Sequence, residues 1–167
     1  ARYPAFDGLN LTFETREGIL KHCSAANARA LLATEPDGPA RRFVHGGQPS
    51  LEAQLVNLSD ELAYSAHDVD DGVRSGLITL AHWHDAVRRE FPALGGRRLL
   101  YETLRRMLSA QVHDLIDHAA ATLAAAESAQ GPLDADAVRR LPALQGLSEP
   151  LREQTAGLKR FLFKALY

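Results

Sequence analysis

Apolar residues recur every three to four positions along most of this chain, which is the period of an α-helix with one face in a core. The pattern is clearest between Pro49 and Gly72. Its apolar positions, all on one stripe of such a helix, are Leu51, Leu55, Leu58, Leu62, Ala66, Val69 and Val73. Because Pro49 and Ser50 suit a helix start and Gly72 to Gly76 suit a helix end or kink, we predict a central helix between them.

The same period, punctuated by Gly and Pro, predicts helices on both sides of the central one. They cover residues 12 to 31 or 32, 79–91, 97–126, 134 or 136 to 141, and 149 to at least 167. Three of them follow residues that commonly cap helix N-termini, namely Thr12, Asp134 or Asp136, and Ser148. Residues 1–11 are expected to be extended, and residues 34–49, rich in Gly and Pro, to form a long loop.

No segment shows a sustained alternation of apolar and polar residues, which is the pattern of a strand. We therefore predict an all-α helical bundle whose longest helix lies within residues 96–127. At 167 residues and 46% hydrophobic, the chain can bury one sizeable core, and nothing requires a second domain. The prediction is a single all-α unit over residues 1–167.

The polar stripe of the central helix is unusual. Its members, spaced by three and four residues, are Asn57, Asp60, Tyr64, His67, Asp68 and Asp71. No Lys or Arg lies between Ser50 and Val73, so these carboxylates repel one another unless a cation neutralises them. Spacing alone is consistent with a binding site and equally with an acidic exposed face. A calcium loop starting at Asp68 fails, because its sixth and twelfth positions would be Val73 and Thr79 in place of Gly and Glu.

Charge and cysteine content exclude several classes of protein. The net charge of −2 predicts no general affinity for nucleic acid and none for an acidic membrane. The one cysteine, Cys23, cannot form an internal disulfide, and no apolar run approaches the roughly 20 residues that a membrane span needs. We expect a cytoplasmic protein. Since the chain begins without Met or a signal-peptide pattern, we also expect the natural protein to start upstream.

Four stretches carry a family resemblance. They are Phe6–Thr12 running to Glu17–His22, then Gln48–Gln54, Ser59–Gly72 and Leu158–Phe163. The third, with the sequence SDELAYSAHDVDDG, is similar to the late motif of the deoxynucleoside triphosphate triphosphohydrolases. In these motifs and their order, the chain resembles the deoxyguanosine triphosphatase-like branch of the HD-domain superfamily. The resemblance covers nearly the whole chain and implies the C-terminal part of an HD-domain-type fold.

The resemblance implies an enzyme that converts a deoxynucleoside triphosphate and water to a deoxynucleoside and triphosphate. Such enzymes bind a divalent metal ion, such as Mg²⁺ or Mn²⁺, through a His, an adjacent His-Asp pair and a later Asp. Only the later Asp has a counterpart here, and by motif position it is Asp60. The other ligands precede this segment in the family. We therefore expect residues 1–76 to complete the catalytic domain, residues 77–167 to form a C-terminal helical region, and the chain alone to be inactive.

Two substrate contacts also follow from the resemblance. Four and eight residues after the metal ligand, the family places an aromatic ring against C2′ of the sugar and a carboxylate on the 3′-hydroxyl. Tyr64 and Asp68 match these positions, although a role for Tyr64 at the edge of the core stays open. The family's habit further suggests a homo-oligomer, with a deoxynucleoside triphosphate as substrate.

Other chemistry-bearing residues have weaker claims. The His-Asp pairs at 67–68, 84–85 and 113–114 lack the family's surroundings, so we interpret them as coincidental. We expect His113 and His118 to be hydrogen-bonded structural residues. Cys23 is more typical of a small core residue than of a nucleophile. The patch formed by His82, Trp83 and His84 has no assigned role. The competing hypothesis for the chain is a non-catalytic helical oligomerisation or regulatory module that keeps the family's scaffold.

Overall fold

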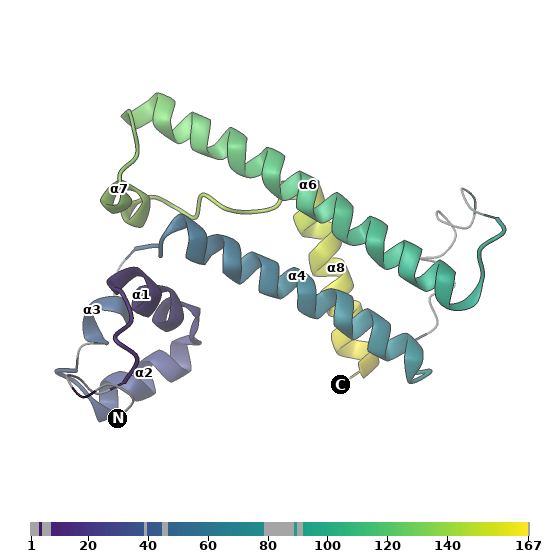
Figure 1. Cartoon of the computed structure of the whole chain (residues 1–167), viewed down its shortest axis with the longest axis horizontal. Helices are drawn as coiled ribbons and strands as arrows, with labels where there is room; N and C mark the ends of the chain where they lie inside the picture. The colour runs from purple at the N-terminus through teal and green to yellow at the C-terminus, as the bar shows by residue number, and fades with distance from the viewer. Residues whose placement is uncertain are drawn as a thin grey trace. The chain divides into compact units, whose positions relative to one another are not determined.

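A computed structural model of the chain describes residues 4, 8–38, 40–44, 47–78, 89 and 92–166. Within these residues it contains seven helices and no strand (Figure 1), so the predicted all-α fold is confirmed. The helices are α1 (Phe13–His22), α2 (Ala25–Thr34), α3 (Arg41–Val44), α4 (Leu51–Arg74), α6 (Gly96–Gln130), α7 (Ala135–Arg140) and α8 (Glu149–Leu166). Apart from residue 89, the predicted helix over 79–91 lies outside the described residues, as does the patch at 82–84.

The central helix α4 begins and ends where the sequence predicts. The hydroxyl of Ser50 accepts a hydrogen bond from the backbone N–H of Ala53 at 3.3 Å, which satisfies one of the free donors of the first turn. Beyond the last turn, Gly76 adopts a φ of 76°, a left-handed conformation that glycine reaches without strain. These two local features fix the length of α4 at 24 residues.

Helix α6 is the longest described helix, as predicted, but it runs past the predicted end. Its 35 residues reach Gln130, because the helix-favouring run after Ala119 contains no residue that would break it. The break comes at Gly131, which has a φ of 82° and donates its N–H to the Glu127 carbonyl at 2.8 Å. A left-handed glycine just after the last turn is a common helix ending.

The predicted single helix from residue 12 to residue 31 or 32 is wrong, because α1 and α2 are separate helices. Ser24 starts α2 as its N-cap, and its hydroxyl accepts a hydrogen bond from the Asn27 N–H at 3.1 Å. Cys23, just before it, is extended with φ −68° and ψ 149°. Serine side chains compete for backbone donors in this way, which favours a new helix start over helix continuation. The predicted loop over 34–49 also contains the short helix α3.

The last two helices start where the sequence predicts. Asp134 caps α7 by accepting the Ala137 N–H at 2.7 Å. Ser148 precedes α8, but its hydroxyl does not act as the expected cap. It donates instead to Asp114 of α6 at 2.5 Å, and the Ser148 N–H donates to the same carboxylate at 2.8 Å. Asp114 thereby ties the start of α8 to the middle of α6.

The contacts divide the chain into two compact units. Unit 1 comprises the described residues up to Asn57 together with Leu123–Gln145, and unit 2 comprises those from Leu58 to Thr122 together with those from Gly146 onward. The functional division that we predict between residues 1–76 and 77–167 stays a prediction. None of the described helices has the length and apolar character needed to cross a membrane.

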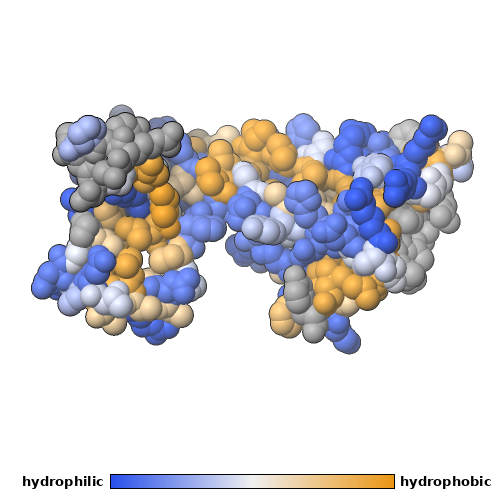
Figure 2. All heavy atoms as spheres, turned by 60° about the horizontal axis from the view of Figure 1, so that its bottom comes forward, coloured by the Kyte–Doolittle hydropathy of each residue, from blue (hydrophilic) through white to orange (hydrophobic). Residues whose placement is uncertain are grey.

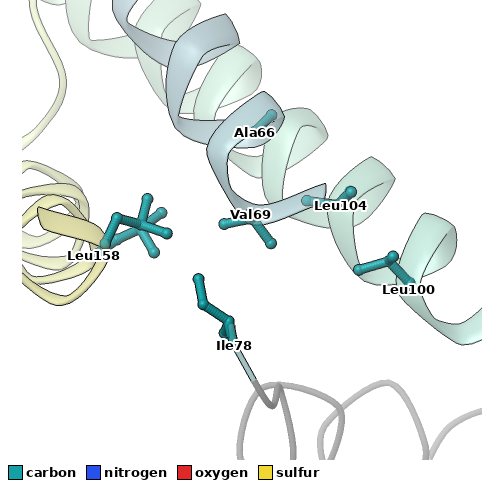
Figure 3. Close-up of a cluster of buried hydrophobic side chains, with 7 residues drawn as sticks. Ala66, Val69, Ile78, Leu100, Leu104 and Leu158 are labelled. Atoms are coloured by element: carbon teal, nitrogen blue, oxygen red, sulfur yellow. The ribbon is translucent and has the colours of Figure 1, made fainter. Parts of the chain in front are cut away.

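The main core of unit 2 is formed by α4, α6 and α8. Its buried members are Ala66, Val69, Ile78, Leu100, Leu104, Leu158 and Leu162. Figure 3 shows Val69 of α4 facing Leu158 of α8, with Ile78 and Leu104 close by. Gly72 lets α4 approach Ile78 closely, since a Cβ on it would lie 2.4 Å from the Cδ1 atom of Ile78 and would displace that side chain. The apolar stripe predicted from the sequence therefore includes Ala66 and Val69, which hold α4 in this unit. The prediction is wrong for Leu55, which is exposed.

Unit 1 is tied together by polar groups as well as by Phe43, which is fully buried. The buried Glu17 of α1 accepts two hydrogen bonds from Arg139 of α7, each of 3.1 Å, and this bond raises the pKa of the arginine. The Arg139 carbonyl accepts the Gln48 N–H at 2.8 Å. A Cβ on Gly47 would lie 1.8 Å from that carbonyl oxygen, so a larger residue at position 47 would push the two segments apart.

The buried side chain of Gln54 joins the first turns of α4 to the segment before α8. Its Nε2 donates to the Pro49 carbonyl at 3.0 Å, and its Oε1 accepts the backbone N–H groups of Leu144 at 2.8 Å and Gln145 at 3.3 Å. These residues all belong to unit 1. One amide side chain thus satisfies three backbone groups that would otherwise be buried without partners.

Replacing Gln54 by Leu is expected to lower the free energy of unfolding by about 1–3 kcal/mol, because two backbone donors and one acceptor lose their partner. Urea unfolding of the variant followed by circular dichroism measures the change. The exposed Gln130 supplies a matched control, since Gln130→Leu removes the same amide from the surface. Equal stability of the two variants would contradict this account of Gln54.

Candidate functional site

The three residues assigned by resemblance lie on α4. Asp60, Tyr64 and Asp68 are four residues apart, so each lies about 6 Å along the helix axis from the next and on the same side. Asp60 is exposed, Asp68 is half-buried, and 65% of the Tyr64 surface is accessible. In the part of the chain that the structure describes, none of the three forms a hydrogen bond or ion pair. The described residues therefore leave their polar atoms available to a ligand.

The exposure of Tyr64 bears on the alternative that it is an edge residue of the core. The buried cores of unit 2 are formed by other residues of α4, among them Leu62, Ala66 and Val69. An exposed tyrosine ring with an unbonded hydroxyl contributes little to such a core. The described structure therefore favours a surface role for Tyr64, and its contact with a sugar stays a prediction.

Asn57, at the N-terminal end of the polar stripe, is engaged within unit 1. Its Oδ1 lies 2.8 Å from Nδ1 of His22, which belongs to α1. This hydrogen bond holds the end of α1 beside α4 and uses the side chains of both residues. It also directs His22 away from a role as a base for its neighbour Cys23, whose thiol donates to the Leu20 carbonyl at 2.8 Å.

Two carboxylates of α4 that lie outside the polar stripe form ion pairs with basic residues. Glu61 lies 2.5 Å from Lys159 of α8, and Asp70 lies 3.1 Å from Arg74 in the next turn. Arg74 also donates to the Tyr101 hydroxyl at 2.9 Å, and this bond, with the Asp70 charge, raises the pKa of Arg74. The ion pairs of α4 thus involve Glu61 and Asp70, whereas the stripe carboxylates Asp60, Asp68 and Asp71 form none with the described residues.

A groove of about 360 Å³ runs along α4 and α6 in unit 2. Its walls are mostly apolar, with Leu62, Ala66 and Leu104 among them, and its polar lining includes His67 and Tyr101. His67, which belongs to the polar stripe of α4, therefore also lines the groove. Asp60, Tyr64 and Asp68 do not line the groove.

Comparison with known proteins gives the same family as the motifs. The proteins named deoxyguanosinetriphosphate triphosphohydrolase-like protein from Ralstonia pickettii, Bordetella pertussis and Azoarcus sp. are 54%, 50% and 50% identical to this chain. Each match covers 99% of the chain. The chain is a homologue of these triphosphohydrolase-like proteins. It spans 43% or 44% of their length, and no protein-family model matches it.

The motif at Leu158–Phe163 has a structural role that its sequence does not reveal. Leu158 and Leu162 are buried in the main core of unit 2, and Lys159 pairs with Glu61. The motif therefore packs α8 against α4, the helix that carries Asp60, Tyr64 and Asp68. None of the motif's residues belongs to the polar stripe, so the motif bears on that stripe only by positioning α4.

The coincidental His-Asp pair of α6 has the structural role that we predict for His113. His113 Nδ1 lies 2.7 Å from the Ser109 carbonyl one turn earlier, and Asp114 binds Ser148. The two side chains of the pair therefore bind different segments. The prediction is not confirmed for His118, whose exposed ring forms no hydrogen bond with the described residues. The pair at 84–85 lies outside the described residues.

Among the described residues, no three His, Cys, Asp or Glu side chains come together in a way that could hold a metal ion. Asp60 offers one exposed carboxylate on a rigid helix, which is suitable as a single ligand of a hard divalent cation. A metal site at Asp60 would thus need ligands in addition to those that the described residues provide.

Proposed function

We propose that the whole protein containing this chain hydrolyses deoxynucleoside triphosphates to deoxynucleoside and triphosphate, with a divalent metal ion as cofactor. The observation that carries the proposal is the polar face of α4, where Asp60, Tyr64 and Asp68 are spaced by about one turn and form no hydrogen bond or ion pair with the described residues. The names of the relatives support it, since they are deoxyguanosinetriphosphate triphosphohydrolase-like proteins at 50–54% identity. We propose dGTP as the first substrate to test.

Asp60 is assigned as a metal ligand. Its carboxylate is exposed and unpaired, while its neighbour Glu61 is neutralised by Lys159. When bound, a divalent metal ion would polarise a phosphoryl oxygen and lower the pKa of a water molecule. We propose that imidazole and carboxylate ligands from outside this 167-residue segment complete the site, so that the segment is inactive alone.

Tyr64 and Asp68 are assigned to the deoxyribose. The sugar of a nucleotide whose phosphates lie beside Asp60 would be within one to two helical turns, the distance at which these residues follow Asp60 on α4. The Asp68 carboxylate can accept the 3′-hydroxyl proton. The Tyr64 ring can occupy the space at C2′, where a ribose hydroxyl would lose its water without gaining a partner.

Replacing Tyr64 by Ala in the whole protein is expected to weaken selection against ribonucleotides, because the ring no longer fills the space at C2′. The ratio of kcat/KM for dGTP to that for GTP should fall about tenfold or more. Release of triphosphate from each nucleotide gives both values. The control is Ile116→Ala, which truncates a similarly exposed residue of α6. An unchanged ratio in a folded Tyr64 variant would show that the tyrosine is not part of the gate.

A further inference from the structure

A pocket of about 530 Å³ lies between α6 and α8 in unit 2. Its walls include Met107 and Gln111 from α6, and Leu151, Thr155 and Phe161 from α8. This volume falls within the range of about 300–1,000 Å³ that is usual for small-molecule sites. Such sites typically combine apolar walls with a few polar groups that orient the ligand.

The pocket contains a buried amide that is only partly satisfied. Gln111 is 3% exposed, and its Nε2 donates to the Thr155 hydroxyl at 3.3 Å. Within the described part of the chain, its Oε1 is buried and has no hydrogen-bond partner. Turning the amide by half a rotation would place Oε1 on Thr155 and leave the NH₂ group unpaired. One end of this amide therefore lacks a partner in either orientation, which is rare for a buried polar group.

A glycine keeps the pocket open. Gly157 lies in the middle of α8, where glycine is less favourable than alanine. A Cβ built on it would meet only Nη2 of Arg160, at 3.9 Å, so packing does not exclude a side chain there. Gly157 lines the pocket, and any side chain at this position would take up part of its volume.

The composition of the walls limits the chemistry of an occupant. None of the described residues that line the pocket is Asp, Glu, Lys or Arg. A phosphate or carboxylate moved into this space would lose its water without meeting an opposite charge. Phe161, which is 47% exposed, offers an aromatic surface to an occupant. Hydrophobic residues also gather in patches on the face of the molecule that Figure 2 shows.

We propose that this pocket binds a compact, uncharged molecule that has a flat apolar body and one N–H or O–H donor. The apolar body packs against Met107, Leu151 and Phe161, and the donor binds Oε1 of Gln111 once the amide rotates to expose that buried atom to the pocket. Binding gives the buried oxygen its missing partner. The occupant is thus chemically unlike a nucleoside triphosphate.

The test uses indole, which has such a body and one N–H donor, and benzothiophene, which has the same bicyclic shape with sulfur in place of N–H. Each is titrated into the ¹⁵N-labelled 167-residue chain and followed by NMR. Indole is expected to shift the resonances of residues 107–111 and 151–161. In Gln111→Leu, the ratio of indole affinity to benzothiophene affinity should fall about tenfold, because only the contact to the N–H is lost.

Gly157→Leu is expected to abolish binding of both compounds by filling the pocket, and Gln130→Leu, on the surface, should leave both unchanged. Failure of indole to bind the wild-type chain, or shifts confined to other residues, would overturn the proposal. So would an affinity ratio that Gln111→Leu leaves unaltered, since the amide would then have no part in recognition. The same resonances could instead shift as the protein concentration rises, with no effect of indole. That result would assign the pocket to a contact between copies of the chain and would also overturn the proposal.

Discussion

Replacing Asp60 by Ala in the whole protein is expected to lower kcat/KM for dGTP by more than about a thousandfold. Loss of a residue that merely supports a metal ligand costs about 10–100-fold, so loss of a ligand itself should cost more. Asp60 is exposed and forms no bond within the described structure, and alanine is the best helix former. The change should therefore leave the fold and stability of α4 intact.

Steady-state release of triphosphate and metal titration by calorimetry together test this role. The variant should lose both activity and tight metal binding, while Glu153→Gln, which removes an exposed charge from α8, should keep both. Wild-type activity in a folded Asp60→Ala protein would remove the metal-ligand assignment. If the wild-type whole protein itself released no triphosphate from any deoxynucleotide, the competing hypothesis of a non-catalytic module would be favoured.

Replacing Asp68 by Ala is expected to lower kcat/KM for dGTP about 5- to 150-fold, which corresponds to the 1–3 kcal/mol of a lost hydrogen bond to a charged group. The loss should be smaller than that for Asp60, because a contact to the sugar orients the substrate and does not take part in bond breaking. Comparison with 2′,3′-dideoxy-GTP shows whether Asp68 contacts the 3′-hydroxyl or acts elsewhere in the site.

The dideoxynucleotide lacks the 3′-hydroxyl, so the wild-type protein should already hydrolyse it poorly, and Asp68→Ala should make it little worse. Such non-additivity is the signature of a direct contact between the two groups. If the Asp68 variant slowed dGTP and the dideoxynucleotide by the same factor, the carboxylate would act elsewhere than on the 3′-hydroxyl. The Glu153→Gln protein again supplies the control for the loss of an acidic residue.

The amino-acid sequence determined the helical elements most closely where the signal was local. Ser50 and Gly76 mark the two ends of α4, and Asp134 caps α7. Their effect is predictable because a cap or a left-handed glycine acts through hydrogen bonds within one turn. The error at Ser24 arose from the same kind of local competition. Its hydroxyl was able to start a new helix in the middle of a periodic stretch, and periodicity alone does not reveal which of the two outcomes is lower in free energy.

For the candidate site, the sequence determined the spacing of Asp60, Tyr64 and Asp68 on one side of a helix, since that follows from 3.6 residues per turn. Only the tertiary structure decided which polar residues of α4 are already engaged. Asn57 meets His22, Glu61 meets Lys159, and these partners lie 35 and 98 residues away along the chain. Contacts over such separations depend on how the helices pack, which local propensity does not encode. Among the described residues, they leave the stripe carboxylates Asp60, Asp68 and Asp71 without an ion pair.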